Sequence, residues 1–201
     1  SFVCSDCGSD HPRWQGQCND CKAWNTLSEF VVSQSSSPAV RNLSGYAGQT
    51  TAQIETLSSI DLQALPRFTS GFKEMDRVLG GGIVPGSAVL IGGSPGAGKS
   101  TLLLQVMCHL AEGKSVLYIT GEESLQQVAM RAQRLGLAND RLQLLAETNV
   151  EAICDLALTH KPDVMVIDSI QVMHVVDVTS APGSVSQVRE SAAYLTRFAK
   201  Q

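Results

Sequence analysis

From about residue 66 onward, short apolar runs alternate with longer segments in which apolar residues recur at helical spacing. The short runs are rich in Val, Ile, Leu or Met, which is typical of strands buried on both faces of a parallel sheet. The predicted strands cover residues 87–91, 115–120, 141–145 and 163–168. Because strands and helices alternate, the pattern predicts βαβ units and an α/β fold with a central, mainly parallel sheet.

Helix-start and helix-stop signals divide the intervening segments. The predicted helices cover residues 101–112, 125–135, 148–160 and 184–199. The third and fourth begin with capping boxes, formed by Thr148 with Glu151 and by Ser184 with Gln187. No strand follows the fourth helix, so we expect the sheet to be incomplete in this chain.

The residues before this alternation have a different composition. Residues 1–30 are rich in Cys, Trp and Gly and contain too few apolar residues to build a core without help. Residues 31–65 are rich in Ser, Thr, Gln and Gly with little periodicity, which is typical of a flexible linker. The predicted organisation is a small unit over residues 1–30, a linker over 31–65 and an α/β domain over 66–201.

Composition and charge narrow the class of protein. A chain of 201 residues, 43% hydrophobic and 17% charged, can bury one core and carry a small appendage, which excludes a disordered protein. The net charge of -4 means that nucleic-acid binding requires a local basic patch or other subunits. No apolar run approaches the roughly 18 to 20 residues of a membrane span, and no signal peptide is recognisable. We therefore expect a cytoplasmic protein that does not interact with membranes.

The stretch GGSPGAGKST, residues 92–101, lies between a predicted strand and a predicted helix. It contains the phosphate-loop motif G-x-x-x-x-G-K-[ST], in which glycines let successive backbone N–H groups point at phosphate oxygens. We predict that Lys99 contacts the β and γ phosphates of ATP, that Ser100 binds Mg²⁺ and that Thr101 supports the α-phosphate region. The predicted nucleotide-binding residues of this loop are Gly93, Ser94, Pro95, Gly96, Ala97, Gly98, Lys99, Ser100 and Thr101.

Acidic residues follow two of the predicted strands. Asp168 ends the run VMVIDS and is the predicted second contact for Mg²⁺. Glu122 and Glu123 follow the strand in VLYITGEES, at the sheet edge where ligands bind in open α/β folds. We favour Glu122 as the general base of ATP hydrolysis, with Glu123 as its neighbour or substitute. Alternatively, either carboxylate only contributes a negative charge that stabilises the N-terminus of the next helix.

Four of the six cysteines lie within two CxxC pairs near the N-terminus. The spacing Cys4-x2-Cys7, ten residues, then Cys18-x2-Cys21 predicts a tetrahedral Zn²⁺ site. Four protein ligands leave no open position, so we expect a structural zinc ion. Redox chemistry is the alternative, but it requires a thioredoxin-like βαβ context. The remaining cysteines, Cys108 and Cys154, fall inside apolar patterns and are expected in the core.

Other side chains near the CxxC pairs leave two interpretations open. His11 lies between the pairs and is expected at the surface, because four cysteines already complete the ligand set. Trp14 and Trp24, with Arg13 and Lys22, could form a face for nucleic acid or a partner protein. Equally, both tryptophans could only shield the metal cluster.

Four stretches carry a resemblance to a known family. They are FVCSDCGSDHPRWQGQCNDCKAWNT, LPRFTSGFKEMDRVLGGGIVPGSAVLIGGSPGAGKSTLL, LYITGEESLQQVAMRAQRLGL and VMVIDSIQVMHVVDVTSAPGSVSQVRE. Over essentially its whole length, the chain resembles the N-terminal part of the RadA (Sms) family, bacterial DNA-repair and recombination ATPases related to RecA. The resemblance implies a four-cysteine zinc finger over residues 1–30 and the N-terminal part of a RecA-like ATPase domain over 66–201.

The same resemblance implies an activity and partners. Members of the RadA family are DNA-dependent ATPases that bind single-stranded DNA and branched recombination intermediates and promote branch migration. They assemble into rings, expected to be hexamers, with ATP between subunits, and a recombinase or replicative helicase is a further expected partner. In the RecA-like plan the loop over residues 169–190 is expected to face the DNA; alternatively, it is only a surface connection. A K-N-R-F-G stretch and a Lon-protease-like domain, which the family carries, do not occur in this sequence.

Two other functions remain open from the sequence alone. One is a nucleotide-gated binding module, in which ATP binding controls oligomer or partner assembly and turnover is incidental. The other is a KaiC-like signalling ATPase, which shares a GEES-type sequence but is not expected to carry the two CxxC pairs.

Overall fold

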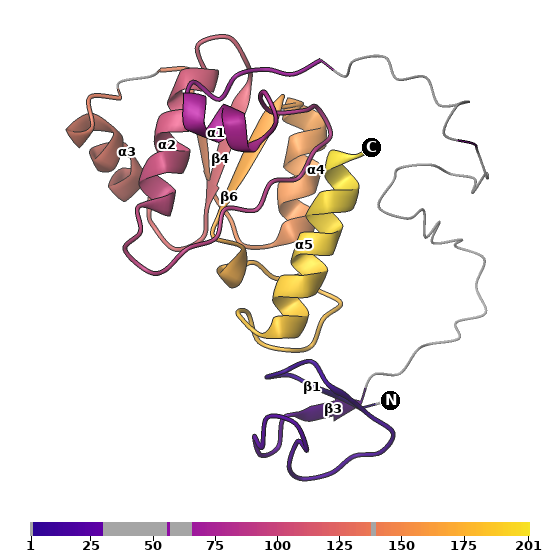
Figure 1. Ribbon diagram of the computed structural model, residues 1–201. Coiled ribbons are helices and arrows are strands. Elements are labelled where there is room, and N and C mark those ends of the chain that lie inside the picture. The colour runs from indigo at the N-terminus through magenta and orange to yellow at the C-terminus, as the bar shows by residue number, and fades with distance from the viewer. Residues whose placement is uncertain (1, 30–55, 57–65, 138–139) are drawn as a thin grey trace.

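The computed structural model describes residues 2–29, 56, 66–137 and 140–201. It forms a small cysteine-containing unit, residues 2–29, and an α/β unit, residues 66–201, shown in Figure 1. The predicted linker over 31–65 lies outside the described residues except for Thr56. The domain boundaries drawn from the sequence therefore stay predictions.

The N-terminal unit is a three-stranded antiparallel sheet with strand order β2-β1-β3. Its strands are β1 (Phe2–Cys4), β2 (Asp10–His11) and β3 (Leu27–Glu29). The buried apolar core consists of Cys4, Cys18 and Leu27, with Phe2 packed against them. Because two of these three buried residues are candidate metal ligands, this core is consistent with a unit that depends on metal for its folding.

A parallel three-stranded sheet organises the α/β unit, with strand order β5-β4-β6. Its strands are β4 (Val116–Thr120), β5 (Gln143–Ala146) and β6 (Val164–Asp168). The central strand β4 is buried along its entire length. In the register, Thr120 lies opposite both Ala146 and Asp168, so the carboxyl ends of the three strands meet at one edge. The predicted α/β fold with a parallel sheet is confirmed.

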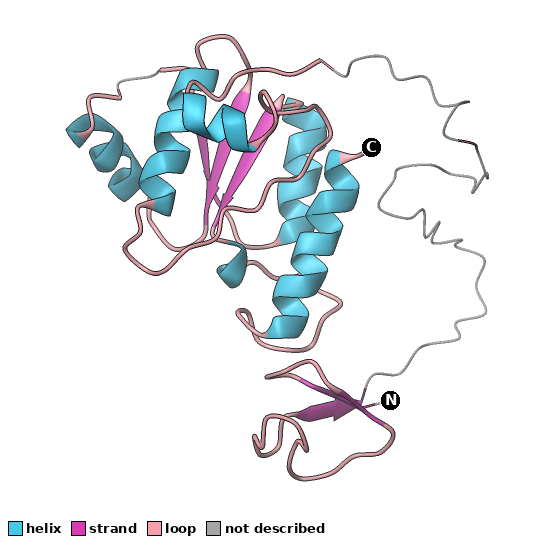
Figure 2. Ribbon diagram, viewed as in Figure 1, coloured by secondary structure: helices cyan, strands magenta, loops and turns pink. Residues whose placement is uncertain are grey.

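Helices cover both faces of this sheet (Figure 2). Side chains alternate along β4, so that Val116 and Tyr118 belong to one core while Leu117 and Ile119 belong to the other. The first core is completed by α2 (Lys99–Leu110) and α3 (Leu125–Arg134), and the second by α4 (Val150–His160) and α5 (Val185–Ala199). A short helix, α1 (Lys73–Val78), and a 3-10 turn, η2 (Ile170–Val172), complete the described elements. Within the described residues, no helix is long and apolar enough to cross a bilayer.

Three details of the predicted elements are wrong. Ser184 caps α5 by accepting from the Gln187 N–H, but the Gln187 side chain does not complete the predicted capping box, because it bonds to Val175 and Val178. Residues 87–91 do not form a strand; they pair with neither β5 nor β6, and Leu90 is 85% exposed. An apolar run becomes a strand only when a neighbouring strand exchanges backbone hydrogen bonds with it, and in the described residues neither edge strand of this sheet does so. Helix α4 is capped by Asn149, whose side chain accepts from the Ala152 N–H, and not by Thr148. The Thr148 carbonyl instead accepts from the N–H of His174.

Candidate functional site

The candidate nucleotide site lies where the phosphate loop meets the carboxyl edge of the sheet. The loop leads into α2 through Gly98, which has φ 84° and serves as the helix N-cap. Gly96 also adopts a positive φ, 78°, and no atom lies within 4 Å of where its Cβ would stand. These two conformations favour glycine and leave the loop surface open for a ligand to approach the backbone. The conformations of Gly96 and Gly98 therefore agree with the phosphate-loop motif predicted from the sequence.

Lys99 already lies over the loop that precedes it. Its Nζ donates to the carbonyl oxygens of Gly93, at 2.8 Å, and Ser94, at 3.0 Å. The Ala97 N–H donates to the Ser94 carbonyl and closes the turn. The positive charge of Lys99 and the N-terminal end of α2 are therefore on the same side of the loop, an arrangement that attracts phosphate.

Asp168 connects the phosphate loop to the sheet. Its Oδ1 accepts from the Ser100 hydroxyl at 3.1 Å, and its Oδ2 accepts from the Tyr118 hydroxyl. Tyr118 is fully buried, and burial, together with the hydrogen bond to Asp168, raises the pKa of its phenol. Tyr118 therefore stays protonated as a donor and fixes the orientation of the carboxylate. Tyr118 was not predicted as a site residue; the available signal was one polar hydroxyl in the otherwise apolar run VLYIT.

Glu122 and Glu123 lie in different environments. Oε1 of Glu122 accepts from the Ser169 hydroxyl at 2.5 Å, so Glu122 lies beside the end of β6. The carboxylate of Glu123 pairs with the guanidinium of Arg131 in α3, and its backbone N–H donates to Thr120 Oγ1 at 3.1 Å. Glu123 is thus held toward helix α3, while Glu122 is held toward Asp168. Ser169 and Arg131 were also missed, because nothing in their local sequence marks them as partners of these acids.

The turn that carries Glu122 is tightly packed. A Cβ on Gly121 would lie 2.5 Å from Val172 Cγ2 and 3.0 Å from both Met173 Cε and Thr148 Cγ2. The Gly121 N–H donates to the Asp168 carbonyl at 3.0 Å, which extends the pairing of β4 with β6 beyond the strands. Only glycine fits this position without displacing η2, so the path of the backbone into Glu122 is closely defined.

The predicted DNA-facing loop, residues 169–190, is anchored by one buried side chain. Gln187 accepts from the Val175 N–H and donates to the carbonyls of Val178, at 2.8 Å, and Ser180, at 3.0 Å. Arg189, the only arginine or lysine of the loop, lies 3.4 Å from the carboxylate of Glu190. The loop therefore presents no basic cluster, and its contact with DNA stays a prediction.

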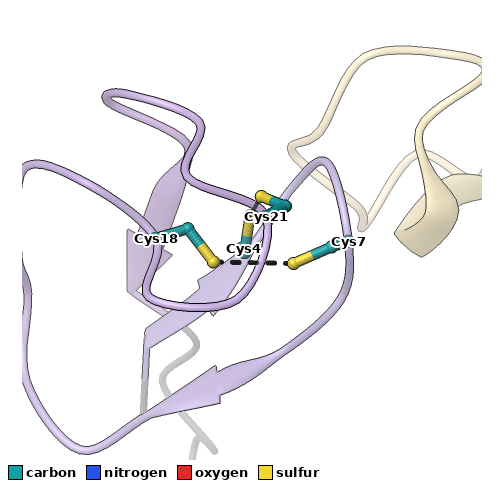
Figure 3. Close-up of side chains that lie close together, drawn as sticks. All are labelled: Cys4, Cys7, Cys18 and Cys21. Atoms are coloured by element: carbon teal, nitrogen blue, oxygen red, sulfur yellow. Dashed lines mark hydrogen bonds between the residues drawn. The ribbon is translucent and has the colours of Figure 1, made fainter.

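The four N-terminal cysteines point toward one another (Figure 3). Their sulfurs lie within 4.8 Å of one another, with Cys4 Sγ 3.6 Å from Cys21 Sγ and Cys7 Sγ 3.5 Å from Cys18 Sγ. Zinc–sulfur bonds of about 2.3 Å in a tetrahedron place sulfurs about 3.8 Å apart, so this set fits one Zn²⁺ ion. The backbone N–H of Cys21 lowers the pKa of the Cys18 thiol to about 5, although burial opposes this effect. At Cys21 the backbone N–H of Ala23 opposes the shift, but burial and the three neighbouring sulfurs raise the pKa, so the thiolate that a metal requires is favoured at Cys18 and not at all four cysteines.

Side chains around this cysteine cluster contradict one expectation and bear on one alternative that the sequence left open. His11 is not at the surface: it is 6% exposed, and its Nε2 lies 3.5 Å from Cys18 Sγ. Trp14 is 57% exposed and Trp24 is 70% exposed, so neither acts mainly as a shield for the buried sulfurs. Cys108 and Cys154 are buried in the two cores of the α/β unit, as predicted.

Comparisons with known proteins agree with the two units. Residues 57–201 match the family described as AAA domain, and residues 2–29 match the family described as rubredoxin metal binding domain. All of this chain aligns with "DNA repair protein RadA" of Haemophilus influenzae at 64% identity and of Escherichia coli at 65% identity. The RadA protein of Bacillus subtilis is 47% identical over 99% of the chain.

These alignments cover only part of each relative. The chain spans 44% of the Haemophilus influenzae and Escherichia coli proteins and 43% of the Bacillus subtilis protein. The resemblance to RadA inferred from the sequence is confirmed along the whole of this chain. With a phosphate loop at the edge of a parallel sheet and a matching family over residues 57–201, the chain belongs to the AAA domain family.

Proposed function

We propose that the α/β unit binds ATP with Mg²⁺ and hydrolyses it. The observation that carries this proposal is the hydrogen bond from Ser100 to Asp168, 3.1 Å long between residues 68 positions apart. It joins the start of α2 to the end of β6, the two places from which phosphate-loop ATPases bind Mg²⁺. The match to the AAA domain family supports the same activity.

Each residue has a defined task in this proposal. The backbone of residues 93–98 binds the phosphates, Lys99 offsets the charge of the β and γ phosphates, and Thr101 supports the α-phosphate region. Ser100 and Asp168 hold Mg²⁺, which, when bound, supplies Lewis-acid stabilisation of the charge on the phosphates. Glu122 accepts a proton from the attacking water, and the products are ADP and phosphate.

The two carboxylates have different partners, and these support Glu122 over Glu123 as the general base. The guanidinium of Arg131 pairs with Glu123 and holds that carboxylate toward helix α3. Among the described residues, the hydrogen-bond partner of the Glu122 carboxylate is the Ser169 hydroxyl, which orients it without an opposing charge. Because Ser169 directly follows β6, this bond holds Glu122 at the end of that strand.

We further propose that the complete protein couples ATP hydrolysis to DNA repair. Relatives named DNA repair protein RadA, aligned over this whole chain, support that role. In this proposal the protein acts as a ring, expected to be hexameric, that binds single-stranded DNA and branched recombination intermediates and promotes branch migration. A recombinase or replicative helicase is the proposed protein partner.

For the N-terminal unit, we propose a structural Zn²⁺ ion bound by Cys4, Cys7, Cys18 and Cys21. The distances between the sulfurs and the match to a rubredoxin metal binding domain support this assignment. No ligand position is left open for a substrate, so the ion contributes to folding and not to catalysis.

ATP turnover by the complete protein, with and without single-stranded DNA, tests the catalytic proposal. Lys99→Ala and Glu122→Gln are expected to lower turnover by about 10²-fold or more, and Glu123→Gln is the matched control at the neighbouring carboxylate. Native turnover in Glu122→Gln, with loss in Glu123→Gln, would contradict the assignment. ATP binding without turnover would instead support the nucleotide-gated binding module.

A further inference from the structure

We propose that His11 is a positioning residue of the cysteine cluster, which donates a hydrogen bond from Nε2 to the Cys18 thiolate and thereby retains the zinc ion. This inference rests on the proposed zinc site but not on the ATPase. Its first support is location. His11 lies on β2, paired with Phe2 of β1, and is 6% exposed, while the Cys18 side chain that it contacts is completely buried.

A chain of hydrogen bonds determines which ring nitrogen carries the proton. Asn19 Nδ2 donates to Gln15 Oε1 at 3.4 Å, which turns the amide nitrogen of Gln15 toward His11. Gln15 Nε2 then lies 3.1 Å from His11 Nδ1. In this orientation the Gln15 amide nitrogen donates to Nδ1, which leaves Nε2 as the ring nitrogen that carries a proton. That nitrogen is the one that faces sulfur.

Two acceptors compete for the Nε2 proton. Cys18 Sγ lies at 3.5 Å, within the range of a hydrogen bond to sulfur. The nearest carboxylate oxygen of Asp20 lies at 3.8 Å, too far for a hydrogen bond, and the Asp20 side chain is 65% exposed. The geometry therefore favours Cys18 as the acceptor, with Asp20 as a more distant charge.

Charge explains why the sulfur needs this donor. Four thiolates carry more negative charge than one Zn²⁺ ion offsets, and Cys4 and Cys18 hold part of that charge away from water. Two other sulfurs have hydroxyl neighbours: Thr26 Oγ1 is 3.2 Å from Cys4 Sγ, and Ser9 Oγ is 2.6 Å from Cys7 Sγ. A metal-bound thiolate can only accept, so these hydroxyls donate to sulfur. Cys18 Sγ accepts from the backbone of Cys21 and Asp20 and lies 3.7 Å from Ser9 Oγ; His11, at 3.5 Å, adds a nearer side-chain donor.

Zinc retention in the intact, zinc-loaded protein tests this proposal. Zinc content is measured first, and then the transfer of zinc to a coloured chelator is followed for the native chain, His11→Leu and His11→Gln. Losing an outer partner of a metal ligand costs about 10- to 100-fold in affinity, so His11→Leu is expected to weaken zinc binding by that factor. His11→Gln keeps a donor and is expected to restore part of the loss. Asp10→Asn, an exposed change on the same strand, is the matched control.

Two spectroscopic measurements separate this role from others. Long-range ¹H–¹⁵N NMR of the zinc-loaded chain is expected to show the His11 proton on Nε2, and Gln15→Leu is expected to yield a mixture of both tautomers. Cobalt substitution is expected to show four sulfur ligands in both native and His11→Gln chains. A proton on Nδ1, a nitrogen ligand in the cobalt spectrum, or native zinc retention in His11→Leu would each overturn the proposal. If the native chain bound no zinc, the zinc assignment itself would fail, whereas the ATPase proposal would be unaffected.

Discussion

The cysteine unit and the α/β unit of this chain are stabilised in different ways. Within residues 2–29, the buried apolar set is two cysteines and one leucine, with Phe2 beside them. In the α/β unit, a completely buried strand, β4, contributes to two apolar cores, one on each face of the sheet. The stability of the first unit depends on four side chains that bind one metal ion. The stability of the second depends on the area of apolar surface removed from water. Each should therefore fail under a different perturbation.

Removal of the metal should show the largest difference between the units. Structural zinc sites of this type contribute about 10–16 kcal/mol of apparent binding free energy, more than a unit of this size can replace with apolar contacts. A strong chelator is therefore expected to unfold residues 2–29 and leave the α/β unit folded. Hydrogen exchange measured by mass spectrometry checks this, with Cys18→Ser as a second route to the same loss. Equal protection of both units after zinc removal would contradict the comparison.

Substitution of Lys99 should affect only the other unit. Lys99→Ala removes the ammonium group above the loop carbonyls of Gly93 and Ser94. Nucleotide affinity is expected to fall by at least about 10²-fold, because the variant lacks the positive charge that this loop directs at the phosphates. Zinc content and thermal stability should not change. Binding of a fluorescent ATP analogue, measured together with zinc content, checks both statements, and a parallel loss of zinc would show that the units are coupled.

A substitution at Gly121 tests how closely the core defines the site. In Gly121→Ala the new methyl group meets the stiff, β-branched side chain of Val172, so η2 or the Glu122 turn must shift. We expect a loss of about 1–3 kcal/mol in the free energy of unfolding of the α/β unit and reduced turnover. Urea denaturation measures the stability. Gly113→Ala is a suitable control, since its Cβ would meet no atom within 4 Å.

The smallest effect is expected at Tyr118. Tyr118→Phe keeps the buried ring but leaves Asp168 Oδ2 without its hydroxyl donor; because Asp168 is only partly buried, the loss in the free energy of unfolding is expected to be about 1 kcal/mol or less. The Mg²⁺ concentration required for half-maximal turnover is expected to change, since the carboxylate is no longer held in one orientation. Unchanged stability and unchanged magnesium dependence would show that Ser100 alone orients Asp168.

Features that depend only on residues adjacent in the sequence were predicted from local signals. The phosphate loop, the two CxxC pairs and the strands around Tyr118 and Val166 each occupy a single short stretch, and their composition follows from burial or from backbone geometry. The fold class and the likeness to RadA followed from these stretches. The roles assigned to the individual site residues stay predictions.

Contacts between distant segments could not be predicted in the same way. The Ser169 hydroxyl meets Glu122 across 47 positions, and the Tyr118 hydroxyl meets Asp168 across 50. Both contacts arise from the register of β4 with β6, which no single segment encodes. The absence of a strand over residues 87–91 could not be predicted either, because a strand requires a pairing partner as well as an apolar sequence. His11 became buried through its pairing with β1.

The direction of one proton at Ser100 has a further consequence. A hydroxyl group has a single hydrogen and two lone pairs, and here the hydrogen points to Asp168. Both lone pairs of the oxygen therefore remain available to a cation without breaking the existing bond. Threonine would preserve this arrangement, whereas alanine would remove both the donor and the ligand. The carboxylate thus selects the rotamer in which the hydroxyl oxygen is ready to act as a ligand before any ion arrives.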